Sequence, residues 1–108
     1  MSGYTLIDAA GLPGSPLDAA AEFHAAIVPQ VRAEPDDVVL AFAPADHSHR
    51  AWRLAAVQEL AREAAPRRVN AVVGAAGAGQ DAVLAFLANA PGVTGQMLQA
   101  DGNSAEMA

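Results

Sequence analysis

The sequence contains no cysteine and no lysine, and its formal net charge is −6. The absence of cysteine excludes disulfide bonds and thiolate chemistry. Proteins that bind a phosphate backbone need clustered positive charge, and here only Arg67 and Arg68 are adjacent. We therefore expect no nucleic acid among the partners of this chain.

Long apolar runs are also absent, since no stretch approaches the roughly 18 residues of a membrane-spanning helix. The N-terminus lacks a basic segment followed by an apolar one, as in a secretory signal. These absences predict a soluble, cytoplasmic protein without a membrane partner.

Aromatic residues make up only 5% of the 108 residues, so the core must be built largely from alanine, valine and leucine. Alanine buries little apolar area, so such a core is thin and favours help from a partner. The length supports one domain, which we expect over residues 1–102, with a flexible tail at 103–108.

Four short β-rich runs alternate with three helical segments, which is typical of an α/β fold with a small parallel sheet, a partial Rossmann fold. The linkers between them carry the proline, glycine and acidic residues that end one element and begin the next. The expected strands are Tyr4–Asp8, Val38–Ala43, Val69–Val73 and Gln96–Ala100.

The central helix is predicted between the N-cap residue Asp46 and Pro66. Its inward face should carry Leu54, Val57, Leu60, Ala61 and Ala64. The opposite face should show Ala51, Trp52, Ala55 and Ala56, followed by Glu59, Arg62 and Glu63. Because an exposed apolar patch commonly marks an interface, the small residues around Trp52 are candidate interface residues.

The first helix is predicted over Leu17–Arg32, with Pro29 kinking it or ending its regular bonding. Its inward residues should be Leu17, Ala20, Ile27, Val28 and Val31, and its other faces should carry Ala19, Ala21, Ala25 and Ala26. His24 then falls on the inward face, as a core or interface histidine rather than a ligand. Ala25 on this helix and Met97 on the terminal strand complete the candidate interface set.

Two runs carry a family resemblance: "RAWRLAAVQELAREAAPRRVNAVVG" and "DAVLAFLANAPGVTGQMLQADG". "LARE", "RVNAV" and "FLA…VTGQ…DG" occur in the order seen in the C-terminal half of the short-chain dehydrogenase/reductase family, especially its acyl-carrier-protein reductase-like members. The chain resembles strands four to seven of that family. The resemblance implies two helices that form a four-helix contact between subunits, and a second contact at the last strand.

The resemblance also implies what is missing. The glycine-rich cofactor turn of the family follows its first strand, which has no counterpart here. The positions of its catalytic Tyr and Lys fall on Asp46 and Arg50, and that of its Ser on Ala43 or Pro44. A carboxylate cannot replace the phenol as a proton donor near neutral pH. We therefore expect no reductase activity, no catalytic residues and no cofactor.

The stretch after Val73 offers a weak candidate ligand site at Gly74, Gly77 and Gly79. It joins a strand to a helix through a glycine-rich turn, and Asp101 follows 22 residues after Gly79, as in a dinucleotide fingerprint. The spacing G-x-x-G-x-G does not match that fingerprint. A shortened loop closed with flexible residues is the alternative interpretation.

The segment "DHSHR" gathers His47, Ser48 and His49 between Asp46 and Arg50. The two histidines are weak metal candidates, because they point about 200° apart on a helix and a third ligand would have to come from elsewhere. Ser48 would need a base and an oriented acid to act as a nucleophile. A polar helix cap with solvated histidines is the alternative.

Three functional hypotheses follow. The first is a non-catalytic reductase-like subunit, either a homo-oligomer (dimer or tetramer) or a hetero-oligomer with a full-length reductase. The second is a small ligand-binding or enzymatic module that uses the Gly74–Gly79 turn for a nucleotide or phosphate, or the "DHSHR" segment. The third is a degenerate fragment that folds without a role.

Overall fold

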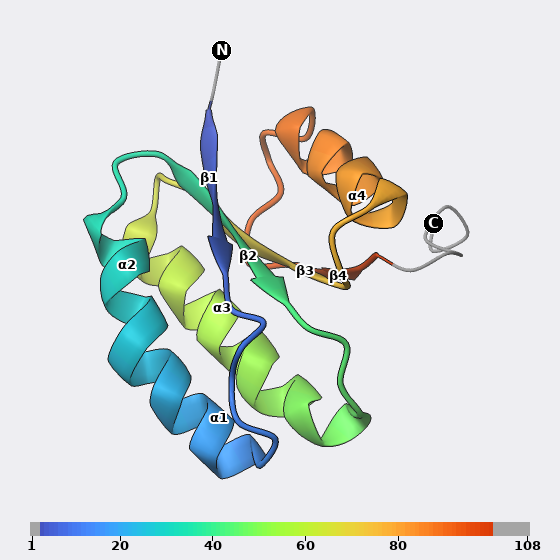
Figure 1. Ribbon diagram of the computed structural model, residues 1–108. Helices are drawn as coiled ribbons and strands as arrows, with labels where there is room; N and C mark the ends of the chain where they lie inside the picture. Colours follow the sequence, from blue (N-terminus) through green and yellow to red (C-terminus); the bar gives the residue numbers. More distant parts are fainter. Residues whose placement is uncertain (1–2, 101–108) are drawn as a thin grey trace.

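The computed structural model describes residues 3–100, and the predicted tail at 103–108 lies outside them. The chain alternates strands with helical segments (Figure 1). The elements are β1 (Tyr4–Asp8), α1 (Pro16–Glu22), the π-helix η1 (Phe23–Ile27), α2 (Val28–Ala33), β2 (Asp37–Phe42), the 3-10 helix η2 (His47–His49), α3 (Arg50–Ala64), β3 (Val69–Val73), α4 (Ala78–Ala88) and β4 (Met97–Gln99).

The four strands form one sheet in the order β1-β2-β3-β4, and every pair is parallel. The register aligns Leu6 with Val39, Val39 with Asn70, and Val72 with Leu98. The predicted α/β class and parallel sheet are confirmed. The observed β2 begins and ends one residue earlier than expected, and β4 is one residue shorter at each end.

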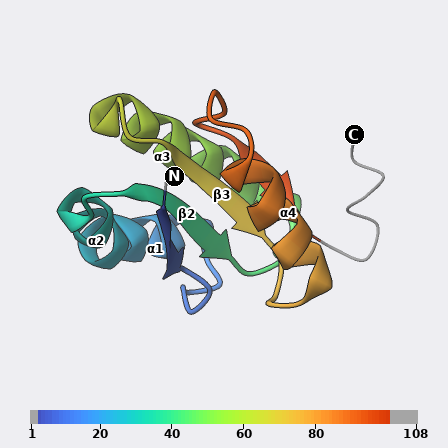
Figure 2. The ribbon, with the colours of Figure 1, turned by 90° about the horizontal axis from the view of Figure 1, so that it is seen from above.

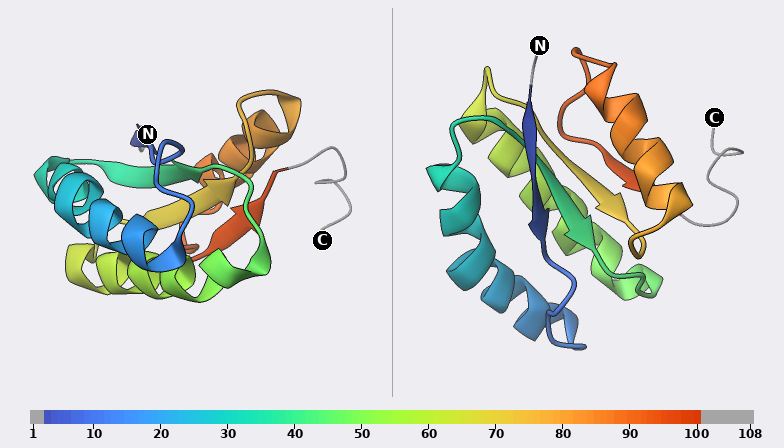
Figure 3. Two further views of the ribbon diagram at one scale, coloured as in Figure 1. Left: turned by 60° about the horizontal axis from the view of Figure 1, so that its bottom comes forward. Right: turned by 45° about the horizontal axis from the view of Figure 1, so that its top comes forward.

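Helices cover the two faces of the sheet unequally (Figures 2 and 3). The continuous run α1–η1–α2 and helix α3 lie side by side on one face, and α4 lies on the other. Each face of the sheet therefore has its own hydrophobic core, and alternate residues of β2 contribute to the two cores. Leu40 and Phe42 face the layer of α1–η1–α2 and α3, while Val39 and Ala41 face α4.

The first helix is irregular, as Pro29 predicts, but its buried face differs from the prediction. A π-turn occupies Phe23–Ile27, and the N–H of Val28 donates to the carbonyl of Phe23, five residues earlier. In an ordinary α-helix, residues four positions apart share a face but drift by about 40° at each step, and the wider turn offsets this drift. The residues buried at this spacing are Ala19, Phe23, Ile27 and Val31.

Two expectations for this helix are therefore wrong. Leu17 is 85% exposed instead of buried, and Ala19 takes the inward position. His24 is exposed, and its Nδ1 lies 2.8 Å from the carbonyl oxygen of Ala20. A strict 3.6-residue period cannot anticipate the change of phase that the π-turn introduces.

The central helix buries Val57, Leu60 and Ala61, as predicted, and it ends at Ala64, two residues before Pro66. Two residues expected on its outer face are covered. Ala56 is only 6% exposed, and the half-buried Trp52 ring lies 5.4 Å from the Phe23 ring and 5.8 Å from the Phe42 ring, centroid to centroid. The cause is the α1–α2 run, which packs beside α3 in the same layer.

The motif "RVNAV" has a structural role. The Arg68 guanidinium forms an ion pair with Asp37 at 2.9 Å and donates to the carbonyls of Leu87 and Ala90. The buried Asn70 side chain donates to the carbonyl of Val93 and accepts from the N–H of Gln96. These bonds fasten the segment between α4 and β4 to β3.

The outer edge of β1 is unpaired within the described sheet, and no helix covers the α4 side of this strand. Tyr4 and Leu6 point to that side and are 38% and 43% exposed. No helix within residues 3–100 is long and apolar enough to cross a membrane.

Candidate functional site

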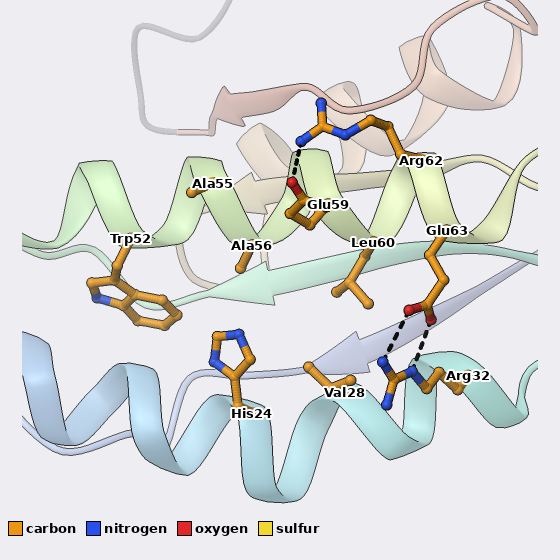
Figure 4. A pocket seen from close by; sticks show the side chains of 10 residues that line it. All are labelled: His24, Val28, Arg32, Trp52, Ala55, Ala56, Glu59, Leu60, Arg62 and Glu63. Atoms are coloured by element: carbon orange, nitrogen blue, oxygen red, sulfur yellow. Dashed lines mark hydrogen bonds and ion pairs between the residues drawn. The ribbon is translucent and has the colours of Figure 1, made fainter.

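A groove of about 590 Å³ runs between the η1–α2 segment and α3, on the side of these helices that faces away from the sheet (Figure 4). It contains most of the residues predicted on the outer face of the central helix. The lining residues are His24, Val28, Arg32, Trp52, Ala55, Ala56, Glu59, Leu60, Arg62 and Glu63.

The centre of the groove is apolar. Val28 and Leu60 lie between the two helices, and both are buried. Trp52 closes one end opposite His24, where its ring packs on Phe23 and its Nε1–H donates to Nδ1 of His49 at 3.1 Å. These contacts hold the indole in place at this end of the groove.

The other end of the groove carries paired charges. The Arg32 guanidinium donates two hydrogen bonds to the carboxylate of Glu63, at 2.8 and 2.9 Å, and Arg62 pairs with Glu59 one turn earlier on α3. The hydrogen bonds from Arg32 hold the pKa of Glu63 below its usual value, and its coulombic attraction acts in the same direction. Two positive and two negative groups therefore border the apolar centre.

The structure brings together some of the candidate interface residues and separates others. Trp52, Ala55 and Ala56 line the groove, although only Ala55 of the three is exposed. Ala51 and Ala25 are exposed but do not line it, and Met97 is half-buried on β4 against the core. The sequence did not predict the Arg32–Glu63 pair, because its two residues lie 31 positions apart.

The glycine turn is explained by packing. Gly74 has a φ of 144°, and a side chain there would bring a Cβ within 2.4 Å of the carbonyl oxygen of Ala100. Gly77 (φ 150°) is the N-cap of α4, and Gly79 lies in its first turn. Asp101, the acid of the proposed fingerprint, lies outside the described residues.

A cavity of about 340 Å³ opens beside this turn, at the carboxyl ends of β1, β2 and β3. Its described lining includes Asp8 and no arginine or histidine, and Asp81 stands in the first turn of α4. A phosphate would meet the α4 N-terminus but no basic side chain in this lining, so the charges disfavour binding there.

His47 and His49, the weak metal candidates, lie in different environments. His49 is buried, with Nε2 donating to the carbonyl of Gly14 at 2.9 Å because Nδ1 accepts from Trp52. Both ring nitrogens are therefore occupied, whereas His47 is exposed. Asp46 caps the turn by accepting from the N–H and the hydroxyl of Ser48, and these bonds lower its pKa. Within residues 3–100, no group of three potential ligands could hold a metal ion.

Arg53 was not predicted as a site residue. It was not placed on the inward face, yet it is only 7% exposed, and its guanidinium lies 4.6 Å from the centre of the Phe42 ring. Because arginine is rarely buried without a partner, the sequence favoured an exposed Arg53. The only hint of a shared site was that Arg53 lies three residues after Arg50, on neighbouring turns of one helix.

Comparison with known proteins agrees with this architecture. Searches of characterised proteins and of solved structures found no significant match. Residues 7–100 match the model of the SDR-like family, described as short chain dehydrogenase-like protein. The match extends from β1 to the end of β4 and includes the Arg68 and Asn70 contacts that organise the last strand. The chain belongs to the SDR-like (short chain dehydrogenase-like) family.

Proposed function

We propose that this SDR-like chain is a non-catalytic, oligomeric subunit with a structural or regulatory role, and that the groove between η1–α2 and α3 is its subunit contact. The observation that carries the proposal is the groove itself: an apolar centre at Val28 and Leu60, with Ala55 exposed at its rim and charged residues at its end. An apolar concavity with a polar border has the composition of an interface core and its rim.

The charges favour a second copy of the chain as the occupant. Around a two-fold axis, the same surface must be complementary to itself. Within each copy Arg32 pairs with Glu63 and Arg62 pairs with Glu59, so this border is neutral and would not repel a second copy, whereas a border of one sign would. Contact with a full-length reductase through the same groove is the hetero-oligomeric form of this proposal.

The residues at the positions of the family's catalytic Tyr and Lys support a non-catalytic role. At the Tyr position, Asp46 has a lowered pKa, because Ser48 donates to its carboxylate. Asp46 is therefore ionised near neutral pH and has no proton to donate to a carbonyl. Arg50, at the Lys position, is exposed and has no phenol to act on.

The test introduces a charged side chain at the exposed rim of the groove on α3. Ala55→Arg places a long cation where a second copy would pack, and it can pair with Glu59 one turn later, so the helix itself is not weakened. Ala82→Arg, on the exposed face of α4, is the matched control. Sedimentation equilibrium at micromolar concentration should give an oligomer for wild type and Ala82→Arg, and a monomer for Ala55→Arg.

A wild-type protein that is monomeric at this concentration would exclude self-association. The hetero-oligomeric form is then tested by the native mass of the tagged protein purified gently from its own cells. A reductase-sized second subunit, lost in Ala55→Arg and kept in Ala82→Arg, would support it. A monomer in both experiments contradicts the proposal.

A further inference from the structure

A second cavity, of about 280 Å³, lies at the amino end of α3 and the carboxyl ends of β3 and β4, separate from the groove. Its lining carries two arginines but one carboxylate, whereas in the groove two arginines are matched by two glutamates. The lining residues are Ala45, Asp46, His47, Arg50, Arg53, Val73, Met97 and Gln99.

The Arg53 guanidinium is an unneutralised charge in this wall. The side chain is 7% exposed, and its Nη1 donates to the carbonyl of Ala43 at 2.9 Å. The buried Nε has no acceptor among residues 3–100, and none of the described carboxylates forms an ion pair with this side chain. Burial lowers the pKa of Arg53. A buried cation of this kind is costly unless an anion neutralises it.

Arg50 adds a second guanidinium one turn away on the same helix, and it also makes no ion pair within the described part of the chain. The carboxylate at the border, Asp46, is engaged by Ser48. The cavity therefore carries two permanent positive charges against one negative charge, with His47 beside them. Val73, Met97 and Ala45 form the apolar remainder of the wall.

We propose that this cavity binds the oxyanion group of a small organic molecule, a carboxylate or a phosphate, between Arg50 and Arg53, with an apolar part of the ligand against Val73 and Met97. Guanidinium groups match both oxyanions through paired hydrogen bonds. The volume lies just below the usual range for small-molecule pockets, which suits a ligand of a few heavy atoms. The proposal is independent of the subunit contact.

The test uses butyrate and butyl phosphate as probes, with butanol as the uncharged analogue and sodium chloride at matched ionic strength. Titrations are followed in ¹⁵N-labelled full-length protein through the backbone amides around residues 46–53 and the Nε–H signal of Arg53. We expect saturable shifts with at least one anion and none with butanol. The preferred anion identifies the oxyanion as carboxylate or phosphate.

Two variants locate the site. Arg50→Gln removes an exposed charge and should leave the fold intact, while Arg53→Met keeps the volume of the buried side chain; each should weaken the preferred anion by about tenfold or more. Arg67→Gln, beyond the carboxyl end of α3 and outside the lining of both the cavity and the groove, is the control and should bind like wild type. Absence of saturable shifts, or equal binding by all three variants, would overturn the proposal.

The nearest carboxylate beyond the described residues is that of Asp101, two positions after Gln99. Asp101→Asn is therefore titrated in parallel. Suppose that wild type does not bind the anions and that Asp101→Asn binds them with shifts at Arg53. The carboxylate of Asp101 is then the partner of the guanidinium, and the proposal of an external ligand fails.

Discussion

At the scale of single residues, two glycines of the β3–α4 turn look alike in the sequence but are needed for different reasons. Both Gly74 and Gly77 adopt positive φ angles that other residues rarely adopt. Only Gly74 also faces backbone, since a Cβ there would meet the carbonyl of Ala100, whereas space around Gly77 is open. The sequence predicted the turn, but it could not show that the end of β4 lies against Gly74.

This difference gives a stability prediction. Gly77→Ala should cost about 1–3 kcal/mol of the free energy of unfolding, through backbone strain alone. Gly74→Ala should cost at least about 1 kcal/mol more, because the end of β4 must move. Urea unfolding followed by Trp52 fluorescence measures both at one protein concentration. Equal losses would contradict the close approach to Ala100.

At the scale of elements, the Arg32–Glu63 pair joins α2 to α3 across the groove. Hydrogen bonds from Arg32 depress the pKa of Glu63 in the folded state, so the unfolded chain binds a proton more readily. The stability from this pair is therefore present above the unfolded carboxyl pKa, about 4.3, and is lost as the pH falls through the lower folded value.

Glu63→Gln should therefore reduce the acid dependence of stability. Near pH 7 wild type should be slightly more stable than this variant, by a small margin because the pair is exposed, and the two should converge between about pH 5 and pH 3 as the urea midpoint of wild type falls further. Glu22→Gln, an exposed residue without an ion pair in the described chain, is the control and should keep the wild-type slope. An unchanged slope in Glu63→Gln would show that the pair is not formed in solution.

The sequence predicted where the helices and strands lie better than it predicted which of their residues are buried. The alternation of β-rich and helical runs identified the strands to within one residue at each end. Asp46 and Pro66 bracket the central helical segment, although its first turn is the 3-10 helix η2 and α3 begins only at Arg50. The first helix was placed correctly, but its π-turn shifted the buried face from Leu17 to Ala19 and exposed His24. The groove could not be predicted, because it depends on two helices packing side by side.

At the scale of the whole molecule, apolar side chains are uncovered in several places within residues 3–100. Tyr4 and Leu6 are exposed on the edge strand, Leu17 is 85% exposed on α1, Phe86 is 54% exposed on α4, and Ala55 is exposed in the groove. An edge strand with apolar exposure favours association unless another surface covers it. The core beneath is rich in alanine and valine, so association should contribute part of the stability.

The thermal midpoint should therefore depend on protein concentration. For a dimer whose association is coupled to folding, each tenfold rise in concentration should raise the midpoint by about 3 °C. Ala55→Arg should remove this dependence, and Ala82→Arg should keep it. Differential scanning calorimetry from 5 to 500 μM would measure the effect, and a constant wild-type midpoint would show that the chain is stable alone.

The order of the sheet has a consequence for how the chain can be assembled. Each described strand pairs with the strand that precedes it in the sequence, so β2, β3 and β4 are added in turn at the same advancing edge. No strand has to insert between two that are already paired. A chain leaving the ribosome can therefore complete one β-α-β unit before the next strand has been synthesised.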